Sequence, residues 1–448
     1  MKTLNRDIRF IFLAVLCGVA SACSFNSGRR NDDFTVIMLP DTQNAIDFRR
    51  QTAEGFAIDS SDIFIEQMQY IAGRAVANGG DVAFVASVGD VWQHVNSQTD
   101  PEHVKRGITA IPNHDHPAVK RFIAADGTLN IEIPKAIEGY QIISEASIPF
   151  GVAPGNHDYD AWWALDATPP NSQIEGLDPS LEDAPIDVTL HVGGLSNFRS
   201  AFGSDTDFFH DRDWYLSGFE GGGSSAQIFS AGGYRFLHLA FEMHAGDDVV
   251  EWAKGVIDQH LGLPTIISTH DFLNPRAERL AASGMDLALV DPEGNNSAEK
   301  LWQDFISETD QIFMVLSGHR PGQAIRIDRN DQGHEVYQIL ADYQSRQQSA
   351  LDTGEPPVKG PAAPFTGDGW LREMVFRLGG DDPIIDVRTY SSHFESYSSE
   401  LDTYAEWYKD LEQPDMTDEE FLAAEEFTIE LSDFHSRFGM PSDAHRHN

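Results

Sequence analysis

The chain has 448 residues and a formal net charge of −40, with 71 acidic against 31 basic side chains. This length allows a large hydrophobic core and more than one domain. A strongly negative surface repels nucleic acid and anionic membranes at long range. We therefore expect a small substrate and no nucleic-acid partner.

The first 22 residues predict an export signal. Basic residues precede an apolar run at residues 10–19, and the small residues 20–22 precede Cys23. The run is too short to span a membrane and is typical of a cleaved leader. Ordinary signal-peptidase cleavage and lipoprotein processing, with acylation of Cys23, both fit the same bond. We favour a lipoprotein of the periplasm or cell envelope over a secreted protein, because the other cysteine, Cys17, lies inside the leader and no internal disulfide is left to form.

Two buried strands with a helix between them are predicted next. Residues 34–40 and 82–88 are apolar runs, and an amphipathic pattern from residue 61 predicts the helix. This order is typical of a βαβ unit with a parallel sheet. The two strands end on polar tips, Asp41-Thr42-Gln43 and Gly89-Asp90.

Further strands and helices continue the pattern. Residues 214–241 predict an antiparallel meander. Helices are predicted near 135–146, 249–260 and 298–307. Three more apolar segments end on polar tips, Gly155-Asn156-His157-Asp158, Thr269-His270 and Gly318-His319.

The five tips are expected to converge, because parallel strands end at the same edge of a sheet. Carboxylate, imidazole and amide groups in one place are typical of a metal centre. Two ions about 3.5–4 Å apart need a shared carboxylate. Asp90, a short carboxylate after glycine, suits that bridging position.

Taken in this order, the tips resemble the signature of the calcineurin-like metallophosphoesterase family, over roughly residues 34–390. The segment Leu39-Pro-Asp-Thr-Gln43 is similar to the first motif of one subgroup, as are Ala341-Asp-Tyr-Gln344 and Gly369-Trp-Leu-Arg372. The resemblance implies an α/β fold, a four-layer α-β-β-α sandwich with a dinuclear centre at the strand ends.

The resemblance also implies roles for individual residues. It implies two divalent metal ions, drawn from Mn, Mg, Ca, Fe and Zn, held by Asp41, Gln43, Asp90, Asn156, His270 and His319. His157 would protonate the leaving group, with Asp158 beside it as an orienting partner. A hydroxide bridging the ions would attack phosphorus in line. We also predict substrate contacts from His94, Arg320 and Arg372; the alternative for the arginines is a structural ion pair.

Two positions depart from the family pattern. Gln43 stands where the first motif usually has histidine, and Pro321 replaces the second histidine of the last motif. Both missing imidazoles belong to the first metal. The remaining oxygen ligands favour Mn²⁺, Mg²⁺ or Ca²⁺ over Zn²⁺ there. We expect one firmly held ion and one weakly held ion.

These patterns predict the domain organisation and the activity. The segments are a signal peptide (1–22), a tether (23–33), a phosphoesterase domain (34–400) with an insertion at about 96–140, and an acidic helical C-terminal extension (401–448). The expected activity is hydrolysis of a small phosphomonoester or phosphodiester outside the cytoplasm. The alternative is a non-catalytic metal-binding lipoprotein that retains the fold. Retention of the proton donor favours the enzyme.

Overall fold

The computed structural model describes residues 32–96, 112–113, 115–165, 189–279, 281, 295–354 and 365–440. The predicted signal peptide, Cys23 and most of the tether lie outside these residues, as do residues 97–111 of the predicted insertion. None of the helices in the described ranges is long and apolar enough to cross a membrane.

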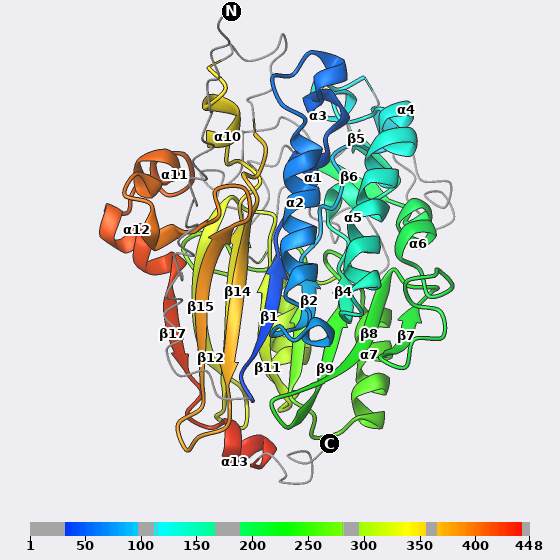
Figure 1. Ribbon diagram of the computed structural model, residues 1–448. Helices are drawn as coiled ribbons and strands as arrows, with labels where there is room; N and C mark the ends of the chain where they lie inside the picture. The colour runs from blue at the N-terminus through cyan, green and yellow to red at the C-terminus, as the bar shows by residue number, and fades with distance from the viewer. Residues whose placement is uncertain are drawn as a thin grey trace, which may run out of the picture. The chain divides into compact units, whose positions relative to one another are not determined.

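The protein has a mixed α/β architecture with two seven-stranded sheets (Figure 1). The first sheet has the order β16 (Ser396–Tyr397), β15 (Ile384–Ser391), β14 (Trp370–Arg377), β1 (Phe34–Leu39), β2 (Val82–Ser87) and β4 (Phe150–Val152), with β17 (Phe427–Glu430) paired to β15. The second sheet has the order β12 (Gly322–Arg329), β13 (Glu335–Asp342), β11 (Ile312–Ser317), β10 (Thr265–Ser268), β9 (Tyr234–Ala240), β8 (Ser224–Ala231) and β7 (Tyr215–Phe219). A small third sheet contains β3 (Pro112–Asn113), β5 (Ala161–Leu165) and β6 (Thr189–Gly193).

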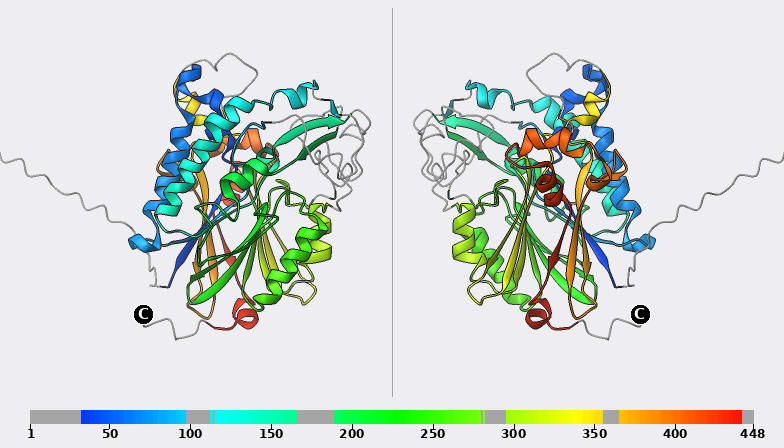
Figure 2. Two further views of the ribbon diagram at one scale, coloured as in Figure 1. Left: turned by 90° about the vertical axis from the view of Figure 1, so that its right-hand side faces the viewer. Right: turned by 90° about the vertical axis from the view of Figure 1, so that its left-hand side faces the viewer.

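Helices cover the outer faces of the two large sheets. The helices α2 (Ser60–Gly73) and α5 (Ile133–Glu145) lie on one side of the strands, and α7 (Asp247–Gln259) lies on the other (Figure 2). The short α9 (Ala298–Leu301) packs with α7 on the second sheet and continues as a π-helical turn at Trp302–Ile306. Other short helices are α1 (Gln43–Ile46), α3 (Pro117–Lys120), α4 (Ala125–Gly127), α6 (Ser196–Phe202) and α10 (Gln348–Leu351).

The packing of strand β1 explains why nearly all of its residues are apolar. Ile37 and Leu39 pack in a core shared with α2 and α5, whereas Val36 and Met38 pack in a second core between the two sheets. A third core joins the second sheet to α7 and α9. A strand buried on both faces is apolar at nearly every position, not at alternate ones. The predicted buried strands are therefore confirmed.

The strand directions bring the polar tips to the same edge. β1, β2 and β4 are parallel neighbours in the first sheet. β9, β10, β11 and β13 are parallel neighbours in the second. The antiparallel meander predicted over residues 214–241 is confirmed as β7, β8 and β9.

The C-terminal segment differs from the prediction of a helical extension. It forms α11 (Tyr404–Glu412), α12 (Asp418–Glu425) and α13 (Phe434–Phe438), but β17 between α12 and α13 pairs antiparallel with β15. Tyr404, Tyr408 and Phe421 are fully buried in the core between the sheets. The segment is therefore part of the folded core and not an appendage, because its aromatic side chains complete the interior.

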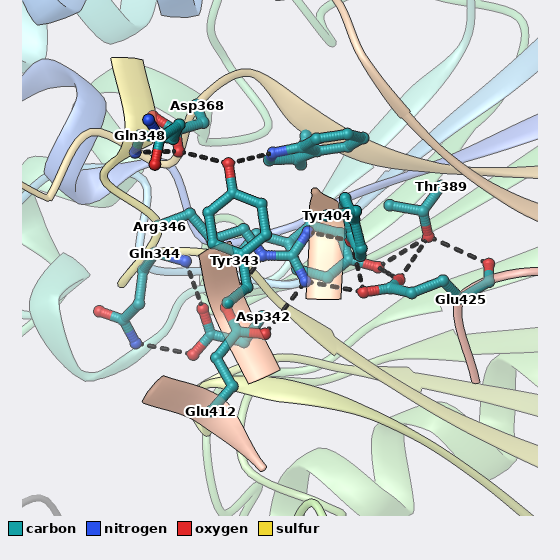
Figure 3. A network of polar contacts seen from close by, with 12 residues as sticks. Asp342, Tyr343, Gln344, Arg346, Gln348, Asp368, Thr389, Tyr404, Glu412 and Glu425 are labelled. Atoms are coloured by element: carbon teal, nitrogen blue, oxygen red, sulfur yellow. Dashed lines mark hydrogen bonds and ion pairs between the residues drawn. The ribbon is translucent and has the colours of Figure 1, made fainter. Parts of the chain in front are cut away.

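A buried ion-pair network ties this segment to the loop after β13. Arg346 donates to the Glu412 carboxylate at 2.9 and 3.0 Å, to Glu425 at 2.7 Å and to the Tyr404 hydroxyl at 2.5 Å (Figure 3). Arg372 pairs with the other oxygen of Glu425 at 3.0 Å. The two arginines and two glutamates have no exposed side-chain surface. Equal numbers of opposite charges offset the cost of removing them from water.

His238 is a buried neutral histidine on β9, an interior strand of the second sheet. Its Nδ1 lies 2.8 Å from Gln227 Oε1 and its Nε2 lies 2.8 Å from Ser268 Oγ. Burial lowers the pKa of His238 to about 3. Because this is below the ordinary value of 6.5, the neutral ring stabilises the fold above pH 6.5, and that stability is lost as the pH falls towards 3.

The acid sensitivity of the fold should therefore depend on His238. Between pH 6.5 and 4.5, the free energy of unfolding should fall by about 2–3 kcal/mol more in the wild type than in His238→Gln. Urea unfolding at several pH values measures the difference. Parallel pH profiles for the two proteins would contradict the assignment of a neutral buried ring.

Candidate metal centre

The polar tips of the two sheets meet in one buried site. Asp41, after β1, accepts a hydrogen bond from the His319 backbone N–H, after β11, at 3.0 Å. Asp90, after β2, lies 3.1 Å from the Nε2 of His270, after β10. Asp90 also accepts from the backbone N–H of His157, after β4, at 2.9 Å. The predicted convergence of the five tips is therefore confirmed.

Two residues of the site hold unusual backbone conformations. Asp90 has φ of 50° and His319 has φ of 72°. Residues other than glycine rarely adopt this left-handed region, and such strain is concentrated at functional sites. Each follows a glycine that lets the chain approach closely. A side chain on Gly318 would meet Asp41 Oδ1 at 2.0 Å, and one on Gly89 would meet the Gly155 backbone N at 2.7 Å.

Gly155 is expected to be essential for the geometry of the site. A Cβ at this position would lie 2.2 Å from Asp90 Oδ1 and 2.7 Å from His270 Cε1. Gly155→Ala must displace one of these side chains, so we expect loss of metal binding in equilibrium dialysis. Gly255→Ala is the control, because its Cβ meets nothing within 4 Å. Undiminished metal binding by Gly155→Ala would show that the site tolerates the displacement.

His270 is surrounded by acceptor atoms. Its Nδ1 lies 2.9 Å from the Val88 carbonyl oxygen, which requires a proton on that nitrogen. Its Nε2 faces Asp90 Oδ1 at 3.1 Å, Asn156 Oδ1 at 3.0 Å and His319 Nδ1 at 3.2 Å. The two oxygens offer lone pairs, and so does His319 Nδ1 when the ring carries its proton on Nε2, so either a proton or a cation must lie among them. Without a cation the proton stays: burial lowers the pKa of His270, but Asp90 and Asp41 outweigh it and raise it to about 10.

This arrangement fits a divalent cation. The ligand atoms of Asp90, His270 and His319 lie within 4.8 Å of one another, and all three residues belong to the predicted set. Asn156 Oδ1 adds a fourth atom through its 3.0 Å contact with His270. Carboxylate, amide oxygen and two imidazoles form a mixed N/O set that suits several transition metals.

The first cation position also has free ligand atoms. Asp41 Oδ1 and Gln43 Oε1 are buried, and neither has a hydrogen-bond partner within the described part of the chain. Unsatisfied buried acceptors cost free energy unless a donor or cation meets them. Burial, together with the nearby carboxylates of Asp342 and Asp90, raises the pKa of Asp41. A cation bound to Asp41, Gln43 and Asp90 would relieve both penalties.

Asp342 is a further acidic residue of the site. It is the last residue of β13, is fully buried, and its pKa is raised to about 7 by burial. It is not among the residues predicted for the site, although it follows the apolar residues 339–341 as the other tips follow their strands. Its place at the end of a sixth strand is the signal that could have identified it.

His157 is held by two aromatic side chains and by a hydrogen bond at one ring nitrogen. Its Nδ1 lies 2.6 Å from the Gln93 carbonyl oxygen, which leaves Nε2 free, 3.9 Å from Asp90 Oδ2. The rings of Trp162 and Phe122 pack against the imidazole at centroid distances of 4.7 and 5.1 Å. Burial lowers the pKa of His157. The free nitrogen can therefore exchange a proton beside the cation positions.

Asp158 does not have the orienting role that we predicted for it. Its carboxylate accepts from the backbone N–H groups of Val91 at 2.9 Å and Gly155 at 2.8 Å. It thereby joins the β2 and β4 tips, while the carbonyl of Gln93 orients the His157 ring. Burial and the Asp90 charge raise the pKa of Asp158 to about 8.

The three residues predicted to contact the substrate are buried, and each has a structural partner. His94 is fully buried, and its Nδ1 lies 2.7 Å from Glu132 Oε1. Arg320 is buried and pairs with Asp271 at 3.2 Å. Arg372 pairs with Glu425 in the buried ion-pair network. Its side chain has no exposed surface, so it cannot reach an anion in solution. For the arginines the ion-pair alternative is the one that the structure supports.

Comparison with known proteins adds little about activity. No protein-family model matches the chain. The chain is similar to the uncharacterised protein YvnB of Bacillus subtilis (strain 168), with 22% identity over 270 residues. The match covers 59% of this chain but only 16% of that protein's length. The geometry of the site is therefore the basis for assigning a function.

Proposed function

We propose that the protein is a metal-dependent phosphoesterase of the calcineurin-like type. It would bind two divalent cations and hydrolyse a small phosphomonoester or phosphodiester. The observation that carries the proposal is the set of acceptors around His270 Nε2, one of which is Asp90 Oδ1. The free Nε2 of His157 lies near the other oxygen of the same carboxylate, Asp90 Oδ2. The three cores, helix to sheet, sheet to sheet and sheet to helix, support the four-layer sandwich that the resemblance implies.

Different residues of the site would bind the cations and transfer the proton. Asp90, Asn156, His270 and His319 would hold one cation, and Asp41, Gln43 and Asp90 the other. Bound divalent cations supply positive charge to the phosphate and activate water as a nucleophile. His157 would hold the proton that the leaving group takes up, at Nε2, since Nδ1 is committed to Gln93. A phosphate anion nearby favours the protonated imidazole and so offsets the effect of burial.

The proposal is tested with metal-stripped protein. It is reloaded with Mn²⁺, Mg²⁺, Ca²⁺ or Zn²⁺ and assayed with p-nitrophenyl phosphate and bis-p-nitrophenyl phosphate. We expect turnover with at least one ion, and none after chelation or in Asp90→Asn. Tight binding of an ion without turnover of either ester would favour the alternative, a non-catalytic metal-binding lipoprotein. Undiminished turnover in Asp90→Asn would place the active site elsewhere.

Export with lipid attachment at Cys23 is part of the proposal. It is motivated by the leader and the small residues before that cysteine. Labelling of cells with a radioactive fatty acid should mark the wild type and not Cys23→Ser. Equal labelling of both would exclude this residue as the anchor.

A further inference from the structure

A pair of side chains lies beside the first cation position and has no role in the proposed chemistry. Asp342 ends β13, and Gln344 follows two residues later. β13 runs parallel to β11 with Leu340 opposite Ser317. Asp342 lies two residues after Leu340, and His319 lies two residues after Ser317. The two residues are therefore at the same edge of the sheet.

The hydrogen bonds of Asp342 determine how the Gln344 amide is oriented. A cation at the first position would favour the ionised form of Asp342, and an ionised carboxylate only accepts. Asp342 accepts from the Gln344 backbone N–H at 2.9 Å and from Gln344 Nε2 at 2.7 Å (Figure 3). Gln344 Nε2 also donates to the His319 carbonyl oxygen at 3.3 Å. Both amide protons are thus committed, and Gln344 Oε1 must serve as an acceptor.

The orientation of the Gln344 amide in turn determines the orientation of the Gln43 amide. Its Nε2 donates to Gln344 Oε1 at 2.5 Å and to Asp90 Oδ2 at 3.0 Å. Both protons of this amide are committed as well. The oxygen, Oε1, is the atom left over, and it is buried and without a hydrogen-bond partner among the described residues. A flipped Gln43 would place its amide oxygen against two other acceptors, Gln344 Oε1 and Asp90 Oδ2. These hydrogen bonds, which lead from Asp342 through Gln344 to Gln43 and are called the relay below, therefore allow only one orientation of the Gln43 amide.

We infer that Asp342 and Gln344 are positioning residues that present the Gln43 amide oxygen to the first cation. Together with Asp41 and Asp90, Gln43 then makes an all-oxygen site, which selects a hard cation such as Mn²⁺, Mg²⁺ or Ca²⁺ over Zn²⁺. The inference deepens the proposed function and rests on its pair of cation positions. It explains how the site works without an imidazole at position 43, because the relay fixes the polarity of the amide.

Metal binding to the stripped protein tests the relay without an activity assay. Isothermal titration with Mn²⁺ should show two sites in the wild type. Asp342→Asn should weaken one of them by about 10–100-fold, as for other residues that orient metal ligands, and leave the second unchanged. Asp352→Asn is the matched control, because its carboxylate accepts from Gln348 Nε2 at 2.6 Å on the exposed surface. Gln344→Leu, which removes the relay without changing charge, should repeat the effect of Asp342→Asn.

A second background separates positioning from a general structural role. Gln43→His replaces the amide by an imidazole, so its first site should bind Zn²⁺ more tightly than that of the wild type. In this background Asp342→Asn should no longer weaken the first site. An equal loss in both backgrounds, an unchanged Mn²⁺ affinity in Asp342→Asn, or a wild type with fewer than two sites would overturn the inference. Failure of the proposed function looks different: two ions bind as expected, but neither ester is hydrolysed.

Discussion

Replacing His157 with alanine is expected to lower turnover by about 10²–10⁴-fold, the usual contribution of a general acid. The metal content should stay at the wild-type level, because the imidazole contacts Gln93, Trp162 and Phe122 and its free nitrogen lies 3.9 Å from Asp90. The loss should be larger for phenyl phosphate than for p-nitrophenyl phosphate, because a poorer leaving group depends more on protonation. Steady-state kinetics and elemental analysis of the same preparations measure both effects.

The control for this substitution is His210→Ala. His210 is a surface histidine with 58% of its side chain exposed, and its ion-pair partner is the neighbouring Asp211. Its removal should change neither turnover nor metal content. If His157→Ala instead loses a metal ion, the residue is a ligand and the proton donor must be sought elsewhere in the site.

Replacing Arg346 with methionine is expected to lower the free energy of unfolding by about 3–5 kcal/mol, because it leaves buried carboxylates without their partner. Arg346 is shared by Glu412 and Glu425, and Arg372 reaches only the second of them. The substitution should also loosen the C-terminal segment, since α11 and α12 supply these glutamates. Urea unfolding and limited proteolysis of the segment after residue 400 are the measurements.

Arg329→Met provides the comparison for Arg346→Met. Arg329 also forms an arginine–glutamate pair, with Glu335 at 2.7 Å, but 63% of its side chain is exposed. An exposed pair contributes about 0–1 kcal/mol, so this variant should be nearly as stable as the wild type. Equal losses in the two variants would mean that burial does not decide the strength of the Arg346 network.

Periodicity and turn residues were enough to predict the elements that carry the site. Each metal-ligand candidate follows a run of mostly apolar residues, and such runs can be recognised because a strand buried on both faces contains few polar residues. Asp90 and His319 lie after such runs and directly after glycines. Their convergence followed from the rule that parallel strands end at one edge.

Hydrogen-bond partners could not be predicted in the same way. Asp158 is next to His157 in sequence, yet its carboxylate turns to the backbone of Val91 and Gly155. Arg372 lies in a segment that resembles a functional motif, but its partner, Glu425, is 53 residues away. Sequence proximity does not say which way a side chain points or which distant group compensates its charge.

The sequence by itself determined the α/β class, the buried strands and the identity of the polar residues at their ends, because local patterns of polarity decide these. Only the tertiary structure showed that β17 completes the first sheet, that His94, Arg320 and Arg372 have buried partners, and that Asp342 and Gln344 orient Gln43. These features depend on contacts between segments far apart in the chain. Their energies come from burial and from hydrogen-bond polarity, which exist only once the chain has folded.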